Sequence, residues 1–335
     1  MKKEKRPIDL YLLSLFLIGG GAVILRMLAC FTEWNGSTMH FNDSMIINAA
    51  NLLIILSIVL FATYFLIAKR GESFVASSSE STTYVPSGMV TVALLFLTID
   101  KLTGLNDAYV ASNSVLSTLS TLIAILGICS IISFFLTIFI QKNENVYKAA
   151  FNMTVVVLLA VYAAYLYFNK QTHPTNSPAK IVDMLAYLFA AIFFLYESRI
   201  SLGRALWQPY AVFGLSAALL TAYSSIPTLV YYAFSGTLIS DSIYESALTL
   251  SLFVFITARM LLLRKISRDE PCEAAKCIEQ LAALREAMIQ ERNSHTRADE
   301  DNNVEESVTE DFENYTMELP IAQTDADEEA AQEND

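Results

Sequence analysis

Hydrophobic residues are gathered into eight long runs that are separated by short, more polar connections. Each run holds roughly 20 residues, and a helix of that length rises about 1.5 Å per residue and covers the ~30 Å hydrocarbon layer of a bilayer. The predicted spans are residues 8–31, 45–68, 86–105, 115–140, 147–168, 180–198, 208–234 and 242–263. The pattern therefore predicts an all-α, polytopic membrane protein with about eight transmembrane helices.

Basic residues near the spans lie mostly on alternate connections, and the side that carries them is assigned to the cytoplasm by the positive-inside rule. The basic residues on this side are Lys2, Lys3, Lys5, Arg6, Lys69, Arg70, Lys142, Lys148, Arg199, Arg204, Arg264, Lys265 and Arg268, whereas the opposite side holds Lys101, Lys170 and Lys180. An even number of spans places both termini on one side. We therefore predict that both termini are cytoplasmic and that the first span is a retained anchor.

Composition changes after Arg268, so the chain is predicted to have three parts. Residues 1–268 form the transmembrane bundle. Residues 269–297 form a short cytoplasmic amphipathic helix, because apolar residues recur there three and four positions apart. Residues 298–335 contain no Lys or Arg and hold 15 Asp and Glu residues. Their negative charge exceeds the whole chain's net charge of −12, so the chain is acidic because of this tail. Such a tail buries too little apolar surface to offset the entropy of ordering and is predicted to be disordered.

The two parts after the bundle contain candidate surfaces for partners. The helix at 272–292 has an apolar stripe that either mediates homodimerisation or cytoplasmic partner binding, or packs on the underside of the bundle. In the acidic tail, Phe312, Tyr315 and Leu319 form an apolar cluster that is a candidate docking segment for a basic protein partner. Solvated disorder without a partner is the alternative. The expected partners of the whole chain are the lipid bilayer and such a protein, with no nucleic acid.

Motifs for catalysis, metal binding and nucleotide binding are not recognised in the chain. The three histidines, His40, His173 and His295, lie in predicted loops or in the tail, which argues against haem or metal ligation within the bundle. No phosphate-binding loop, G-x-S-x-G elbow or H-E-x-x-H pair occurs. We predict no catalytic residues, no metal and no cofactor, although a phospholipid transferase with an unusual site stays open as an alternative.

Ionisable residues within the spans are the remaining candidates for function, because charge in hydrocarbon is costly unless it is paired or hydrated. Near the outer leaflet lie Arg26, Asp100, Lys101, Asp183 and Glu245, and near the inner leaflet lie Glu197, Arg199, Arg204 and Arg259. The outer set is expected to converge if the first, third, sixth and eighth spans are neighbours. Glu197 is expected to pair with Arg259. The candidate intramembrane polar site is therefore Arg26, Asp100, Glu197 and Arg259, and snorkelling to the interface is the alternative.

Two backbone features are candidate helix breaks. Gly20 is the centre of three consecutive glycines in the first span, and Pro227 removes a helical hydrogen-bond donor in the seventh. Close helix packing explains glycines equally well, and a static kink explains the proline.

Two functions agree with these features. The protein is favoured as a small-solute transporter or export component, because eight spans exceed what an anchor requires. The alternative is a membrane-anchored sensor or scaffold that recruits a cytoplasmic partner through its helix and acidic tail. Short loops and sparse cysteine are compatible with a bacterial plasma membrane.

Overall fold

The computed structural model of this 335-residue chain places most of the predicted bundle. It describes residues 7–36, 38, 40–42, 45–64, 83–139, 146–170, 177–202, 206–239, 242–266, 283 and 286–290.

Eight helical segments in the described ranges are long and apolar enough to cross a membrane. They are Leu10–Thr32, Met45–Ala62, Tyr84–Asn106, Ser114–Ile138, Lys148–Phe168, Ala179–Ser201, Trp207–Ser235 and Ile243–Leu261. These segments confirm the predicted spans in number and in place, and most boundaries differ by a few residues. The predicted end of the second span, residues 65–68, lies outside the described residues. The chain is an all-α, multi-pass membrane protein.

The first span is built from three helical pieces, and each later span is mainly one α-helix. The first comprises α1 (Pro7–Ser14), the π-helical turn η1 (Leu15–Gly19) and α2 (Gly20–Thr32). The later helices are α3 (Met45–Ala62), α5 (Tyr84–Thr103), α7 (Ser114–Phe139), α8 (Val146–Phe168), α9 (Pro178–Ser201), α10 (Trp207–Ser235) and α11 (Ile243–Ile266).

Short elements join some of the spans. After α2 the chain forms a small antiparallel hairpin from β1 (Trp34–Asn35) and β2 (His40–Phe41), with Trp34 opposite Phe41. Between α5 and α7 lie the 3₁₀ turn η3 (Gly104–Asn106) and the helix α6 (Ala108–Ser112). Asp107 caps α6, since its carboxylate accepts a hydrogen bond from the Tyr109 N–H at 2.9 Å.

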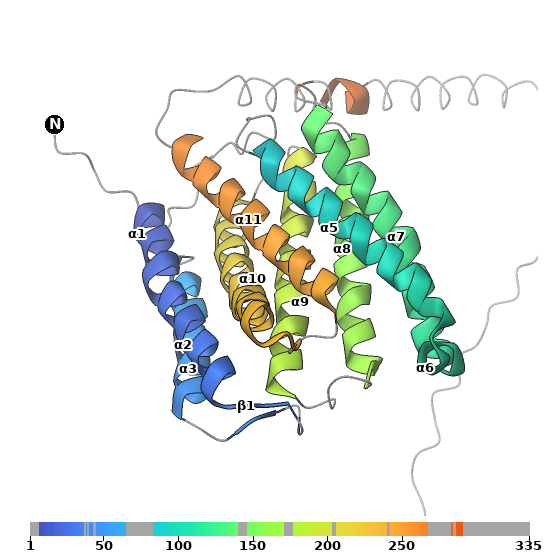
Figure 1. Cartoon of the computed structure of the whole chain (residues 1–335). Coiled ribbons are helices and arrows are strands. Elements are labelled where there is room, and N and C mark those ends of the chain that lie inside the picture. Colours follow the sequence, from blue (N-terminus) through green and yellow to red (C-terminus); the bar gives the residue numbers. More distant parts are fainter. Residues whose placement is uncertain are drawn as a thin grey trace, which may run out of the picture. The chain divides into compact units, whose positions relative to one another are not determined.

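Helix α10 lies at the centre of the bundle and is buried along most of its length. It packs against α2 and α3 on one side and against α9 and α11 on the other (Figure 1). Many of its residues are Ala, Ser, Gly or Thr, and small side chains let neighbouring helices approach closely. A Cβ added to Gly214 would lie 2.6 Å from the end of the Met260 side chain of α11, so a larger residue there would require Met260 to shift.

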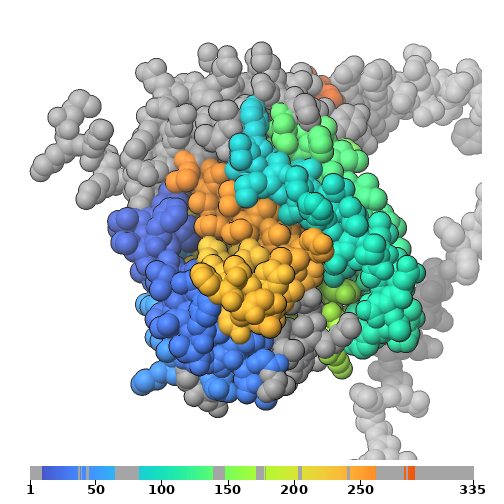
Figure 2. Space-filling view, viewed as in Figure 1, coloured from blue at the N-terminus to red at the C-terminus, as the bar shows by residue number. Residues whose placement is uncertain are grey.

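The outward faces of the surrounding helices are apolar. Leu52, Ile55 and Val59 of α3 are more than half exposed, as are Ile125 and Ile128 of α7. Water would disfavour such faces, whereas lipid tails solvate them, so they fit a bilayer environment. On the face in Figure 2, the end of α10 and α11, in yellow and orange, separate the blue first span from the cyan α5.

The two candidate helix breaks lie in continuous helical segments. Gly20 begins α2 directly after η1, where the hydrogen-bonding pattern changes from α to π for one turn. Gly19 packs against Leu219 of α10, which supports close packing as the reason for glycine at that position. Helix α10 continues through Pro227 to Ser235.

The chain divides into two compact units, residues 1–282 and 283–335. The predicted bundle boundary, at residue 268, lies before this division. Of the second unit the structure describes residues 283 and 286–290, which are helical and agree with part of the predicted helix. Most of the rest of that helix lies outside the described residues, including Ala274, Cys277, Leu281 and Leu284 of its predicted apolar stripe, and so does the acidic tail.

Candidate functional site

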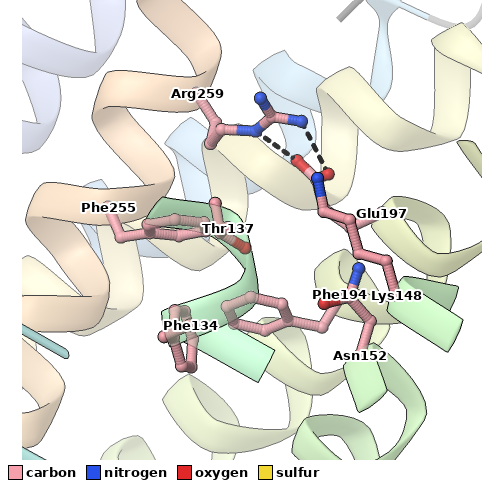
Figure 3. A pocket seen from close by; sticks show the side chains of 8 residues that line it. All are labelled: Phe134, Thr137, Lys148, Asn152, Phe194, Glu197, Phe255 and Arg259. Carbon is pink, nitrogen blue, oxygen red and sulfur yellow. Dashed lines mark hydrogen bonds and ion pairs between the residues drawn. The ribbon is translucent and has the colours of Figure 1, made fainter. Parts of the chain in front are cut away.

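Four helices bring polar residues together at one end of the bundle. Because successive spans run in opposite directions, the last turns of α7, α9 and α11 meet the first turns of α8 at this end. They enclose a cavity of about 10 Å³, which is room for about one water molecule. Its lining residues are Phe134, Thr137, Lys148, Asn152, Phe194, Glu197, Phe255 and Arg259 (Figure 3).

The cavity is dominated by an ion pair between Glu197 of α9 and Arg259 of α11. Arg259 Nε donates to Glu197 Oε1 at 2.7 Å, and Arg259 Nη2 donates to Glu197 Oε2 at 2.7 Å (Figure 3). This two-pronged geometry matches the fork of a guanidinium to the two oxygens of a carboxylate. Glu197 is 6% exposed and Arg259 is 3% exposed, so the pair is desolvated. The contact expected from the sequence is present.

Tyr210 of the central helix α10 completes this group. Its hydroxyl donates to Glu197 Oε1 at 2.6 Å, and its side chain is fully buried. The Glu197 carboxylate therefore joins α9, α10 and α11. Tyr210 was not singled out from the sequence. Its residue type was a usable signal, since the phenol of a tyrosine that is buried in a membrane bundle requires a hydrogen-bond partner.

The remaining lining residues make the cavity partly cationic and partly aromatic. Lys148 of α8 adds a second cation, so the cavity is lined by two positive groups and one negative group. On α8, Asn152 accepts a hydrogen bond from Ser133 of α7 at 2.7 Å. The three phenylalanine rings of the lining pack on one another, at centroid distances between 5.3 and 5.7 Å. A polar group in this cavity would meet donors on one side and ring edges or faces on the other.

Asp100 and its neighbours lie apart from this cavity, towards the other end of the bundle. The Asp100 carboxylate is 3.7 Å from the ammonium of Lys101. That ammonium lies over the ring of Tyr165, at 4.4 Å, and over the ring of Tyr162, at 5.5 Å. Asp183 of α9 accepts a hydrogen bond from Ser224 of α10. This end therefore contains several local polar contacts between helices.

Arg26 occupies a third location, between α2 and α10. Its guanidinium carbon lies 4.5 Å above the centroid of the Tyr223 ring, and the Tyr223 hydroxyl donates to Asn51 of α3 at 2.7 Å. Helix α2 packs on α3 and α10, whereas α5 and α9 contact α11. Of the four residues predicted to form one polar site, the structure brings Glu197 and Arg259 together, and it places Asp100 and Arg26 elsewhere.

The candidate docking residues Phe312, Tyr315 and Leu319 lie outside the described residues, as does most of the helix predicted at 272–292. Within the described ranges, no group of three or more His, Cys, Asp or Glu side chains is arranged to hold a metal ion. Comparison of the chain with known protein families, with curated proteins and with solved structures finds no significant match.

Proposed function

We propose that this multi-pass membrane protein is a small-solute transporter or an export component, and that its solute binds at the cavity around Glu197 and Arg259. The observation that supports the proposal is the buried, two-pronged ion pair in a lining that also holds Lys148. A bundle that served only as an anchor would be expected to avoid such groups, because desolvating charges within a membrane protein is costly. Intramembrane charges mark substrate and ion pathways in many transporters.

The proposed mechanism is an exchange of ionic partners. Glu197 holds α9 to α11 through Arg259, and it holds α10 through Tyr210. A solute with an anionic or electron-rich group would compete with Glu197 for the guanidinium. Lys148 lies in the same lining and offers Glu197 a second cation once the first pair has opened. A ligand shifts a conformational equilibrium only through different contacts in the two states, and this exchange would provide them.

The proposal includes the location and orientation of the bundle. We propose a bacterial plasma membrane, with both termini in the cytoplasm and the loop between α5 and α7 outside. A cysteine introduced at Asp107 should then react with a charged, membrane-impermeant thiol reagent in intact cells. Labelling only after cell lysis would contradict this orientation.

The second candidate function is a membrane-anchored sensor or scaffold that uses residues 269–335 to recruit a cytoplasmic protein. The observation that favours it is the purely acidic tail with its apolar cluster at Phe312, Tyr315 and Leu319. In this case the bundle would be the anchor and the tail would carry the activity.

Complementation of a strain that lacks the gene separates the two candidates, with growth screened across many solutes and stresses. The site variant is Glu197→Gln with Arg259→Gln, since removing both charges leaves neither one unpaired. The matched control is Asp107→Asn, which removes an exposed charge and keeps a side chain that caps α6. The third protein ends after Arg268.

Transport predicts that the site variant reaches the membrane and fails to rescue growth, whereas the control and the truncated protein rescue it. A site variant that rescues, together with a truncated protein that reaches the membrane and fails, would overturn the transport proposal in favour of the scaffold.

A further inference from the structure

The third location, around Arg26, lies on the buried face of α2. The buried residues of this helix are Ala22, Arg26, Ala29 and Cys30, and Glu33 follows directly after its last residue, Thr32. Arg26 and Glu33 are seven positions apart, which is close to two helical turns, so they lie on the same side of the helix. Since α2 packs on α3 and α10, this face belongs to the junction of these three helices.

Both charged side chains on this face carry buried polar atoms that have no hydrogen-bond partner among the described residues. Arg26 is 2% exposed, and its Nε and Nη1 have no hydrogen-bond partner among the residues that the structure describes. Glu33 is 6% exposed, and its Oε2 is likewise unpartnered within those residues. The two form no direct ion pair with each other. Buried polar groups in folded proteins are nearly always satisfied, so an orphaned cation and an orphaned anion on one face call for a common explanation.

The contact of Arg26 with Tyr223 involves the face of the guanidinium and not its N–H groups. A cation over an aromatic ring uses the face of the guanidinium, whereas its N–H groups point outward in its own plane. Arg26 lies over the Tyr223 ring in this way, and the Tyr223 hydroxyl is already committed to Asn51. The unpartnered in-plane donors of Arg26, Nε and Nη1, are therefore suited to an oxyanion, which would accept a charge-assisted hydrogen bond from one of them.

We propose that Arg26 and Glu33 form the two ends of a binding site for a zwitterion, with an oxyanion at Arg26 and an ammonium group at Glu33. The two residues are separated by about 10 Å along the helix axis, so a short ligand that carries opposite charges at its two ends would reach both side chains. Cys30, on the same buried face between them, is a small and largely apolar neighbour. The opposite charges of the site match both ends of a zwitterion and would satisfy both orphaned groups together.

Two sources can supply this chemistry. One is a free amino acid whose ammonium and carboxylate are joined by a short chain. The other is the headgroup of phosphatidylethanolamine, in which the phosphate lies deeper in the bilayer than the ammonium. The order of the residues fits this depth, because Glu33 is at the end of the span and Arg26 is about two turns further in. The site lies on the α2 and α3 side of α10 and does not depend on the transport proposal.

The two tryptophans of the chain allow a local measurement. Trp34 follows Glu33 directly and packs against Phe41, whereas Trp207 packs against Tyr210 near the other site. Full-length Trp207→Phe protein therefore carries one tryptophan, next to the proposed site. It is placed in nanodiscs made only of phosphatidylglycerol and titrated with glycine, 3-aminopropionate and 4-aminobutyrate. Butyrate and butylamine are the singly charged comparisons. A parallel preparation contains phosphatidylethanolamine.

If the ligand is a free zwitterion, we expect a saturable change in Trp34 fluorescence with at least one of the amino acids. Butyrate and butylamine should bind at least about tenfold more weakly, because each satisfies only one end of the site. A lipid headgroup as the ligand predicts the fluorescence change on adding phosphatidylethanolamine, with no further response to amino acids. In either case Arg26→Gln and Glu33→Gln should each abolish the response, and the control Lys101→Gln should retain it.

The double variant Arg26→Gln with Glu33→Gln guards against loss of folding, because it leaves no unpaired charge on this face. It should be at least as thermally stable as the parent and should still show no response. A response that survives in the folded double variant would overturn the proposal. Equal binding of butyrate and 4-aminobutyrate would also overturn it. So would the absence of a response both to the three amino acids and to phosphatidylethanolamine.

Discussion

Arg259 and Arg26 are buried to almost the same extent, at 3% and 2% exposure, yet their surroundings differ in kind. Arg259 donates two hydrogen bonds to one carboxylate, which is itself held by Tyr210. Arg26 has an aromatic ring on its face, and two of its nitrogens are unpartnered within the described part of the chain. Burial alone therefore does not reveal what a charged residue in a membrane bundle does. The paired arginine ties helices together, and the unpaired one has donors available for a ligand.

Both arginines lie beside a tyrosine of the central helix. Tyr210 and Tyr223 are thirteen positions apart on α10, which corresponds to about 20 Å along the helix axis. The same spacing turns the helix by about 220°, so the two side chains leave α10 on different sides. This agrees with their partners, since Tyr210 contacts Glu197 of α9 and Tyr223 contacts Asn51 of α3. The two sites are thus separated by the core helix itself.

The sharpest test of this comparison is to remove one charge from each location. Glu197→Ala removes the carboxylate that accepts two hydrogen bonds from the buried Arg259, and we expect it to lower the free energy of unfolding by about 3–5 kcal/mol. Arg26→Ala breaks no ion pair with the described residues and loses a cation–π contact, which is worth about 0.5–2 kcal/mol. Reversible unfolding in mixed detergent micelles measures both. Equal losses for the two variants would remove the distinction between a paired and an unpaired arginine.

A smaller effect is expected from the two tyrosine hydroxyls. Tyr210→Phe removes a hydrogen bond to a charged carboxylate, and we expect a loss of about 1.5–3 kcal/mol in the free energy of unfolding. Tyr223→Phe removes a hydrogen bond to a neutral amide, and about 1 kcal/mol is expected. The same unfolding measurement applies. A larger loss of unfolding free energy for Tyr223→Phe than for Tyr210→Phe would contradict this ranking. It would mean that the hydrogen bond to Glu197 stabilises the bundle less than the one to Asn51.

The last comparison, which includes the smallest expected effect, concerns two glycines of the first span, next to the Arg26 side of α10. A Cβ at Gly19 would lie 2.6 Å from Leu219 of α10, so Gly19→Ala should destabilise the bundle by about 1–3 kcal/mol. A Cβ at Gly20 would meet nothing within 4 Å, and Gly20→Ala should change the free energy of unfolding by less than about 1 kcal/mol. Thermal unfolding of the two variants side by side checks this. A stronger effect at Gly20 would indicate that its backbone freedom matters more than packing.

Several parts of the candidate sites were readable from the residues in order. Glu197 and Arg259 stand out because charged residues interrupt apolar runs, and their pairing followed from their similar depth on two spans. Arg26 was singled out for the same reason. Lys148 was counted only among the basic residues beside the spans, and Glu33 was not singled out. Their roles depend on burial, which a short stretch of sequence near a helix end does not reveal.

The number, placement and apolar character of the spans follow from hydropathy, because each helix must satisfy its own backbone and be about as long as the bilayer is thick. Neighbour relations between helices follow from side-chain packing across the whole bundle, which no local run of residues encodes. Tertiary structure therefore decided that α10 is the central helix and that Tyr210 binds Glu197. It also decided that Arg26 faces Tyr223 rather than Asp100, because α2 packs on α3 and α10.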